Sequence, residues 1–357
     1  MSSYKVLLKP LECYHFPNEQ NFWHGKRQDS RGLDIPYYSL TELMPSQTTV
    51  LGMLRYLILK KNNQLGFDDK VDQCRREELI GKESFAFDSE IQSFGRLKSL
   101  GPLHLISVTN EEECLLIPTP LNMGQNKRPY SLKIDDNHNY YFSDFSSKTF
   151  VPSFLTIKPN GEIDFVDESA IFSKVYKSRV DTSERTGNNN KDSFFKLEML
   201  VLKDQYSFQF YVDIDEEMDG QSELVFLGGN KSLFEIRFEK VEESFDEHVF
   251  LPQSIVNRIR NSLAGNPTLE PGMKVYYCLS DTYGCQEQLL FATSTMKSMR
   301  NLRTTQYSSD IKSRFEAGSL ITLFGAGSVL YADRELLVSE NARNIGLNQL
   351  IEIGEKK

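Results

Sequence analysis

Apolar positions recur at a helical spacing early in the chain. In "MPSQTTVLGMLRYLILKK", residues 44–61, they fall at Val50, Leu51, Leu54, Leu57 and Ile58. This spacing gives an amphipathic helix one face for a core. The sequence therefore predicts a buried helix directly after a polar loop over residues 17–43.

The opening turn of this helix consists almost entirely of hydroxyl and amide side chains. Ser46 is a typical N-cap, whose oxygen accepts free N–H groups of the first turn. The same turn also suits an anion, because N–H groups and the positive end of the helix dipole point toward it. The neutral donors that would complete such a site are Ser46, Gln47, Thr48 and Thr49. Both interpretations stay open on the sequence alone.

Alternating positions predict strands on both sides of the helix. "SYKVLLKPLECYHF" begins with a strand pattern, and a strand followed by a loop and a helix is half of a split βαβ unit. "GPLHLISVTNEEECLLIPTPLNM" predicts a hairpin with strands at 103–108 and 114–117. A short helix is expected near 71–79.

The second half of the chain is rich in predicted strands. Residues 194–215 have the pattern of strand, tight turn, strand, and 222–241 that of two strands joined by a glycine pair. A helix at 254–263 and a strand at 273–280 follow. The pattern predicts an α+β fold with two domains, 1–123 and 171–357, and an insertion or connection at 124–170.

Composition narrows the class of protein. With 357 residues and 39% hydrophobic residues, the chain can bury two ordinary cores. It has no run of about 18 apolar residues and its start lacks the features of a signal peptide, so we expect a cytoplasmic protein without a membrane partner. Five scattered cysteines suit reduced thiols better than a disulfide framework.

The negative charge is concentrated in one block. The net charge is −9, and residues 213–247 hold twelve carboxylates against three cations, so the remaining chain is formally neutral. This leaves room for basic surfaces, although a solvated charged face is the ordinary alternative. Two basic stretches stand out: Lys174, Lys177, Arg179, Arg185 and Lys191, and then Lys297, Arg300, Arg303, Lys312 and Arg314.

Signatures of catalysis are missing from the sequence. It has no phosphate-binding loop, no paired-histidine zinc helix and no nucleophile elbow, so we expect no cofactor. Cys278 and Cys285 are spaced too widely for a zinc site, and no metal is expected. His15 or His24 could deprotonate a ribose hydroxyl, but neither has an evident acid or base partner in the sequence.

Several segments, taken in order, resemble the third subunit of the Cmr complex, the type III-B CRISPR effector, in the RAMP superfamily. The similar segments are "MPSQTTVLGMLR", "GPLHLI" with "LLIPTPLNM", "SRVDTSERTGNNNKDSFFKLEMLVL", "LGGNKS", and "AGSVLY" with "NIGLNQLIEIG". Together they cover most of the chain. The tip "TGNNNKD" departs from the pattern of the family.

The resemblance implies a noncatalytic RNA-binding subunit of a ribonucleoprotein in antiviral defence. It implies two ferredoxin-like (RRM-like) domains and a protruding β-hairpin, or thumb, at about 174–197. The implied partners are the 5′ tag of the CRISPR RNA, the large polymerase-like Cmr subunit and the backbone Cmr subunits. An alternative is a CRISPR RNA-processing endoribonuclease that uses His15 or His24, and another is a scaffold that contacts only proteins.

A single-stranded tag would be held by cations, by glycine-turn N–H groups and by stacking side chains. The acidic block should face away from it, toward solvent or a basic neighbouring subunit. Lys26, Arg27 and Arg31 are further candidates in the first loop. The candidate RNA-binding residues are Ser46, Gln47, Thr48, Thr49, Arg55, Lys177, Arg179, Val180, Arg185, Lys191, Gly228, Gly229, Lys231, Lys297, Arg300, Arg303, Gly325 and Gly327.

Overall fold

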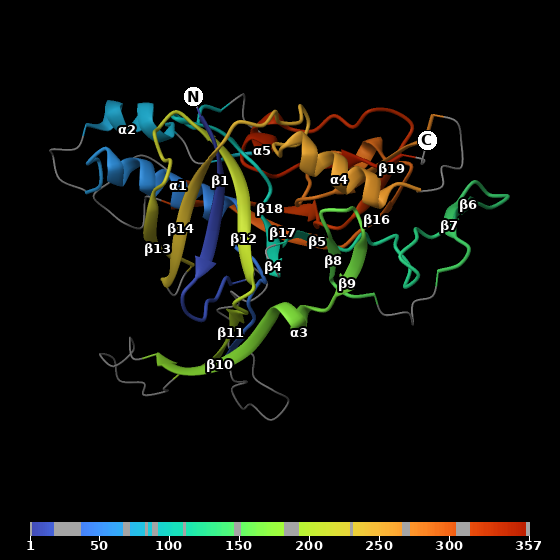
Figure 1. The fold of residues 1–357 in the computed structure, drawn as a ribbon, viewed down its shortest axis with the longest axis horizontal. Coiled ribbons are helices and arrows are strands. Elements are labelled where there is room, and N and C mark those ends of the chain that lie inside the picture. The colour runs from blue at the N-terminus through green and yellow to red at the C-terminus, as the bar shows by residue number, and fades with distance from the viewer. Residues whose placement is uncertain are drawn as a thin grey trace.

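A nine-stranded antiparallel sheet forms the centre of the molecule (Figure 1). The computed structural model describes residues 2–17, 37–66, 72–82, 85–87, 92–109, 112–145, 151–181, 193–228, 231–265, 272–304 and 315–354. The strands follow the order β13 (Ser222–Leu227), β14 (Ser232–Val241), β1 (Ser2–Pro10), β12 (Tyr206–Ile214), β4 (His104–Thr109), β5 (Glu112–Pro118), β8 (Phe154–Ile157) and β9 (Ile163–Val166), with β3 (Leu97–Leu100) also paired to β12.

The first strand occupies the middle of this sheet. β1 pairs antiparallel with β12 on one side and β14 on the other, so that Val6 lies opposite both Phe210 and Phe238. β3 is also antiparallel to β12 and therefore runs parallel to β1. The connection between β1 and β3 contains helix α1 (Gln47–Lys61). β1, α1 and β3, with β12 inserted between the strands, form a split βαβ unit, of which the sequence predicts the first strand, the loop and the helix.

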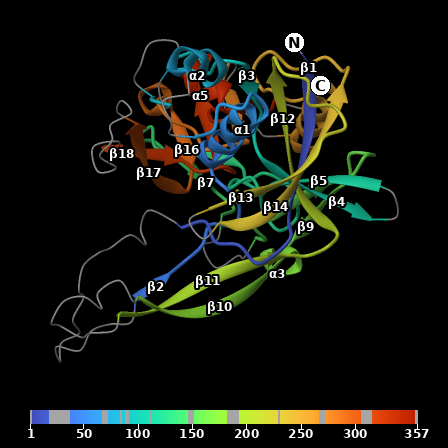
Figure 2. The ribbon, with the colours of Figure 1, turned by 90° about the vertical axis from the view of Figure 1, so that its left-hand side faces the viewer.

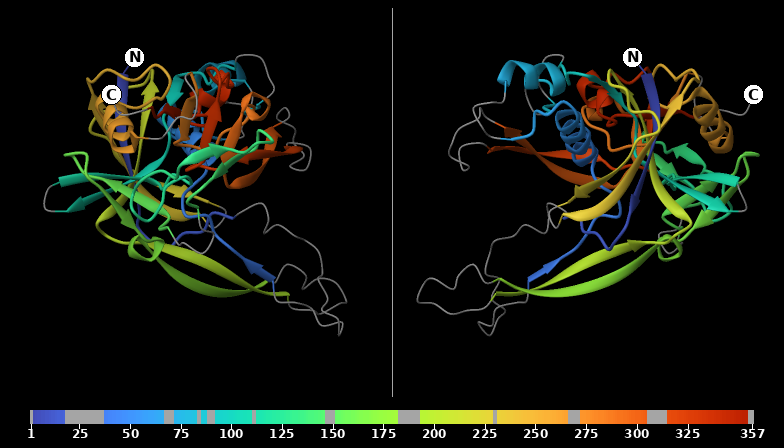
Figure 3. Two further views of the ribbon diagram at one scale, coloured as in Figure 1. Left: turned by 90° about the vertical axis from the view of Figure 1, so that its right-hand side faces the viewer. Right: turned by 60° about the vertical axis from the view of Figure 1, so that its left-hand side comes forward.

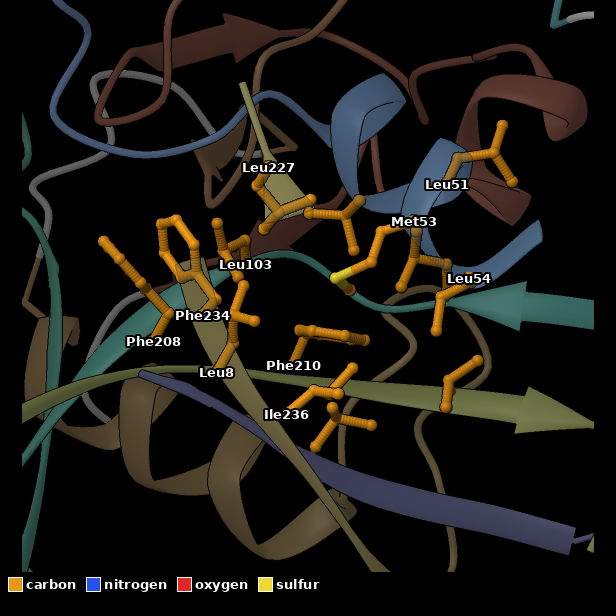
Figure 4. Packing of buried hydrophobic residues seen from close by; sticks show 14 of the residues in the cluster. Leu8, Leu51, Met53, Leu54, Leu103, Phe208, Phe210, Leu227, Phe234 and Ile236 are labelled. Carbon is orange, nitrogen blue, oxygen red and sulfur yellow. The ribbon is translucent and has the colours of Figure 1, made fainter. Parts of the chain in front are cut away.

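α1 packs on one face of the sheet and closes the main core. Its residues Val50, Leu54, Leu57 and Ile58 are buried, as their helical spacing predicts. Figure 4 shows Met53 and Leu54 of the helix beside Phe210 and Ile236 of the sheet. Burying such side chains contributes about 1.5–3 kcal/mol each.

A three-stranded sheet stands away from this core (Figures 2 and 3). β10 (Phe172–Asp181), preceded by α3 (Glu168–Ile171), pairs antiparallel with β11 (Ser193–Leu202), and β2 (Tyr37–Ser39) pairs parallel with β11. These two strands cover the residues where the resemblance implies a thumb, at about 174–197, and "thumb" below means β10 and β11. β11 turns directly into β12, yet the two strands belong to different sheets.

The C-terminal part builds a four-stranded sheet in the order β16 (Phe291–Thr293), β19 (Val329–Ala332), β15 (Lys274–Cys278) and β20 (Leu350–Glu352). Helix α4 (Gln253–Leu263) packs against it through Val256, Ile259 and Leu263. The remaining elements are α2 (Gln73–Ile80), β6 (Leu132–Ile134), β7 (Tyr140–Phe142), the 3-10 helix η2 (Gln286–Gln288), β17 (Met296–Thr304), β18 (Phe315–Phe324) and α5 (Glu340–Asn344).

The structure bears on two expectations from composition. All five cysteines are free thiols, as expected. Among the described residues, no helix is long and apolar enough to cross a membrane.

Residues 154–166, within the segment expected to be an insertion or connection, supply β8 and β9 at one edge of the large sheet.

Candidate nucleic-acid interface

The thumb presents basic and aromatic side chains to solvent. Lys174, Val175, Tyr176 and Lys177 of β10 are all exposed, so both faces of β10 are open to solvent over these residues. Lys196 of β11 places its Nζ atom 4.5 Å from the centre of the Tyr176 ring. Such a cation–π contact orients the ring while about half of the side chain stays accessible. An exposed aromatic ring with lysines on the same face, here Lys174 and Lys196, is a suitable platform for an RNA base.

Two carboxylates partly balance the charge at the base of the thumb. Lys174 Nζ lies 3.4 Å from Glu168 and 3.8 Å from Glu198. Lys177 lies farther along β10, away from this pair of carboxylates, and its side chain is exposed. Arg179 and Val180 continue β10 and lie opposite Phe195 and Phe194. The candidates Arg185 and Lys191 lie outside the described residues.

The opening turn of α1 is occupied by internal hydrogen bonds. The Ser46 hydroxyl accepts the N–H of Thr49 at 3.2 Å and lies within 3.0 Å of the Thr48 and Thr49 hydroxyls, so Ser46 is the N-cap. Gln47 is buried, and its Nε2 atom donates to the carbonyls of Gly101 and Gly346 at 3.0 and 2.9 Å. The polar turn therefore joins α1 to two other segments.

Arg55 lies two turns further along α1 and is half-buried. Its guanidinium carbon is 5.6 Å from the centre of the Phe94 ring. Burial lowers the pKa of Arg55 to about 10. The side chain therefore remains charged at neutral pH and is fixed beside an aromatic ring.

The turn between β13 and β14 lies close to the base of the thumb. A Cβ atom on Gly228, whose φ is +76°, would fall 2.7 Å from the carbonyl oxygen of His15, so this position needs glycine. The neighbouring Tyr14 exchanges two backbone hydrogen bonds of 2.9 Å with Leu200 of β11. Lys231 is exposed in this turn, whereas Gly229 lies outside the described residues. The glycine turn and the thumb thus share the segment that follows β1.

The C-terminal candidates lie at and around strands β17 and β18. The N–H groups of Gly325 and Gly327 donate to the carbonyls of Thr295 and Cys278 at 2.7 and 2.8 Å, so both are used inside the protein. Lys297 forms an ion pair of 3.3 Å with Asp281. Arg300 and Arg303 lie on β17, opposite Leu320 and Glu316 of β18. Lys312 and Arg314, like Lys26, Arg27 and Arg31 of the first loop, lie outside the described residues.

His15, one of the two histidines considered as a catalytic base, is held by hydrogen bonds inside the protein. His15 is buried, with Nδ1 at 2.8 Å from the Glu198 carbonyl and Nε2 at 3.2 Å from the Ser39 hydroxyl. Both ring nitrogens are therefore engaged inside the protein. His24 lies outside the described residues. Among the described residues, no group of three or more potential ligands is placed to hold a metal ion.

The acidic block contains carboxylates in ion pairs and carboxylates that are exposed to solvent. Glu216 pairs with Arg96, and Glu235 with Arg237. Asp215, Glu217 and Asp219 are exposed in the turn after β12. Because β12 begins beside the end of β11, this acidic turn lies at the opposite end of β12 from the thumb (Figure 1).

Sequence reasoning found the basic residues of the thumb but missed Tyr176. The signal was present in "SKVYKSRV", where a tyrosine lies between lysines on a predicted hairpin. Lys196 was also missed, because its contact with Tyr176 depends on the pairing of β10 with β11.

Comparisons with known proteins give one family match. The family described as "CRISPR-associated protein (Cas_Cmr3)" matches residues 38–263. No curated protein matches the chain. A cryo-EM structure of the Type III-B Cmr-beta bound to cognate target RNA contains a chain that matches with a TM-score of 0.46 and 13% identity, covering 92% of this chain and 86% of that one. A crystal structure of a Csm3–Csm4 subcomplex in the type III-A CRISPR-Cas interference complex matches with a TM-score of 0.39 and 12% identity, over 99% and 100% of the two chains.

Proposed function

This chain belongs to the Cas_Cmr3 family of CRISPR-associated proteins, and from this premise we propose that it is a noncatalytic subunit of a type III-B effector complex. In this role it binds the 5′ tag of the CRISPR RNA and docks the large polymerase-like subunit onto the backbone subunits. The observation that carries the RNA-binding role is the thumb, which stands away from the core with exposed Lys174, Tyr176 and Lys177. Single-stranded RNA is held by such combinations of lysine and aromatic side chains.

We also propose that the fold contains two ferredoxin-like units. The strand order β14–β1–β12–β3, with α1 between β1 and β3, supports the first. The order β20–β15–β19–β16, with α5 between β19 and β20, supports the second. When the four strands of each unit are counted in chain order, the first strand lies between the fourth and the third, as split βαβ topology requires. The first unit takes its last strands from residues 206–241.

The RNA-binding role is tested by measuring the affinity of the full chain for CRISPR RNA with the natural 5′ tag and for the same RNA with a scrambled tag. A Tyr176→Ala, Lys177→Ala double variant should bind the tagged RNA about fivefold more weakly or worse, because one stacked base contributes about 1–3 kcal/mol. Lys158→Ala is the control, since Lys158 is a half-buried lysine away from the thumb, in an ion pair with Glu162 near the β9 edge of the large sheet.

Equal binding of both RNAs by the unaltered chain would contradict the proposal. The noncatalytic role is tested separately by incubating the chain with labelled repeat RNA. Because His15 is buried and hydrogen-bonded at both ring nitrogens, we expect no cleavage that depends on His15. His24 lies outside the described residues, so a His24→Ala variant is measured beside His15→Ala. Cleavage that disappears in either variant, correctly folded, would favour the endoribonuclease alternative.

A further inference from the structure

The large sheet ends in a strand whose outer edge carries no partner among the described residues. β13 pairs only with β14 in this part of the chain. Its sequence, "SELVFL", contains neither proline nor lysine, the residues that commonly protect an exposed edge. Its backbone is therefore open to pairing with another extended chain.

The outer face of the same strand is apolar. Val225 and Leu227 are buried on the side of α1, so Leu224 and Phe226 point to the opposite side and are 57% and 68% exposed. The pairing register places Phe226 opposite Leu233, and Leu11 donates its N–H to the Leu233 carbonyl. Leu11 is itself 50% exposed. We call Leu11, Leu224, Phe226 and Leu233 the edge patch.

Charge differs between the two ends of β13. Within the sheet next to the edge patch, Glu235 and Arg237 pair at 3.2 Å and largely neutralise each other. The strand begins after the turn that exposes Glu217 and Asp219. Lys60 neutralises Glu223 at the start of the strand, and Lys61 lies 3.8 Å from Glu216, which leaves the charges of Glu217 and Asp219 to make this end negative. An occupant of this edge would therefore meet an apolar surface at one end and a negative surface at the other.

We propose that the edge of β13 accepts an extended segment of a neighbouring protein subunit, which adds one strand to the large sheet. Strand addition uses main-chain hydrogen bonds for affinity and alternate side chains for specificity. The segment places apolar side chains on the edge patch and lysine or arginine beside the turn at 215–219. The identity of the neighbour as another subunit of the effector rests on the proposed function, but the edge is separate from the thumb.

The test uses the full chain, assembled with the other subunits of its complex and CRISPR RNA. Phe226→Asp and Leu224→Asp should each weaken assembly at least tenfold, because a carboxylate would be buried against apolar side chains. Leu337→Asp is the control, because Leu337 is 76% exposed on the C-terminal part of the chain. Thermal unfolding of the isolated variants should match the unaltered chain, since these side chains contribute little to the core.

Hydrogen exchange of the backbone amides distinguishes strand addition from contact through side chains alone. Amides within 222–227 should exchange more slowly in the assembled complex than in the isolated chain. Unchanged exchange there, or assembly of the aspartate variants with normal affinity, would overturn the inference. A chain that assembles with protected β13 amides but does not bind the 5′ tag would support this inference and contradict the proposed RNA-binding role.

Discussion

His104 shows how burial and hydrogen bonds fix the protonation state of a single residue. It is the first residue of β4 and lies opposite Gln209 of β12, with Nδ1 at 3.1 Å from the Pro102 carbonyl and Nε2 at 3.2 Å from the Gln209 amide nitrogen. Nδ1–H donates to the carbonyl and Nε2 accepts from the amide, so the ring is neutral. Burial lowers the pKa of His104 to about 4.

This environment predicts a pH-dependent stability. Below the ordinary histidine pKa the unfolded chain binds a proton that the folded chain does not, so the free energy of unfolding should fall as pH drops from about 6.5 toward 4. The loss attributable to His104 should reach roughly 3 kcal/mol. Urea unfolding at several pH values checks this. A His104→Gln variant should lose less stability over that interval, and identical pH profiles would contradict the prediction.

At the residue scale, the sequence identified exposed charged residues better than it identified buried polar ones. The exposed Lys177 and Lys231 stand out in the sequence and are on the surface. Gln47 belongs to the same polar turn as Ser46 but is buried, which becomes visible only when Gly101 and Gly346 are placed beside it. Contacts between distant segments leave little trace in a local pattern.

At the scale of an element, the first turn of α1 offers a clear test of capping. Ser46→Ala should lower the free energy of unfolding by about 1 kcal/mol, whereas Ser46→Gly should cost only a few tenths. Chemical denaturation measures both. Equal stability of the two variants would contradict the role of Ser46 as a cap. Because both remove the hydroxyl, an equal loss of affinity for the 5′ tag would indicate that this oxygen also contacts RNA.

The elements that the sequence predicted best are those with local signals. The hydrophobic period revealed α1 and α4, and short turns revealed the hairpins β4–β5 and β13–β14. The sequence did not reveal that β11 and β12 enter different sheets, or that β8 and β9 extend the large one. Pairing between distant strands is decided by tertiary contacts, which alternation along one strand does not specify.

At the scale of the whole molecule, Gln47 joins three segments. Its Nε2 atom bridges the carbonyl of Gly101, before β4, and that of Gly346, after α5. Gly346 has φ +85°, and a Cβ atom there would fall 2.6 Å from the Gly101 oxygen. The contact therefore connects the N-terminal helix to the C-terminal part of the chain and depends on the absence of a side chain.

Gly346→Ala should destabilise the protein by about 2 kcal/mol or more, because it combines backbone strain with a steric clash. Gly284→Ala is the matched control. Gly284 has a similar φ of +88°, but a Cβ atom added there would meet nothing within 4 Å. The difference between the two midpoints in thermal unfolding measures the clash. Equal midpoint temperatures for the two variants would show that the hydrogen bonds of Gln47 rearrange without loss of stability.

The central position of β1 has a consequence for biosynthesis. β1 is translated before both of its partners, Tyr206–Ile214 and Ser232–Val241. A ribosome must therefore synthesise most of the chain before Tyr4, Val6 and Leu8 gain their neighbours in the sheet. Such long-range pairing slows folding and leaves apolar strands open to aggregation in the meantime. The nascent polypeptide is thus a natural client for chaperones until translation has passed β14.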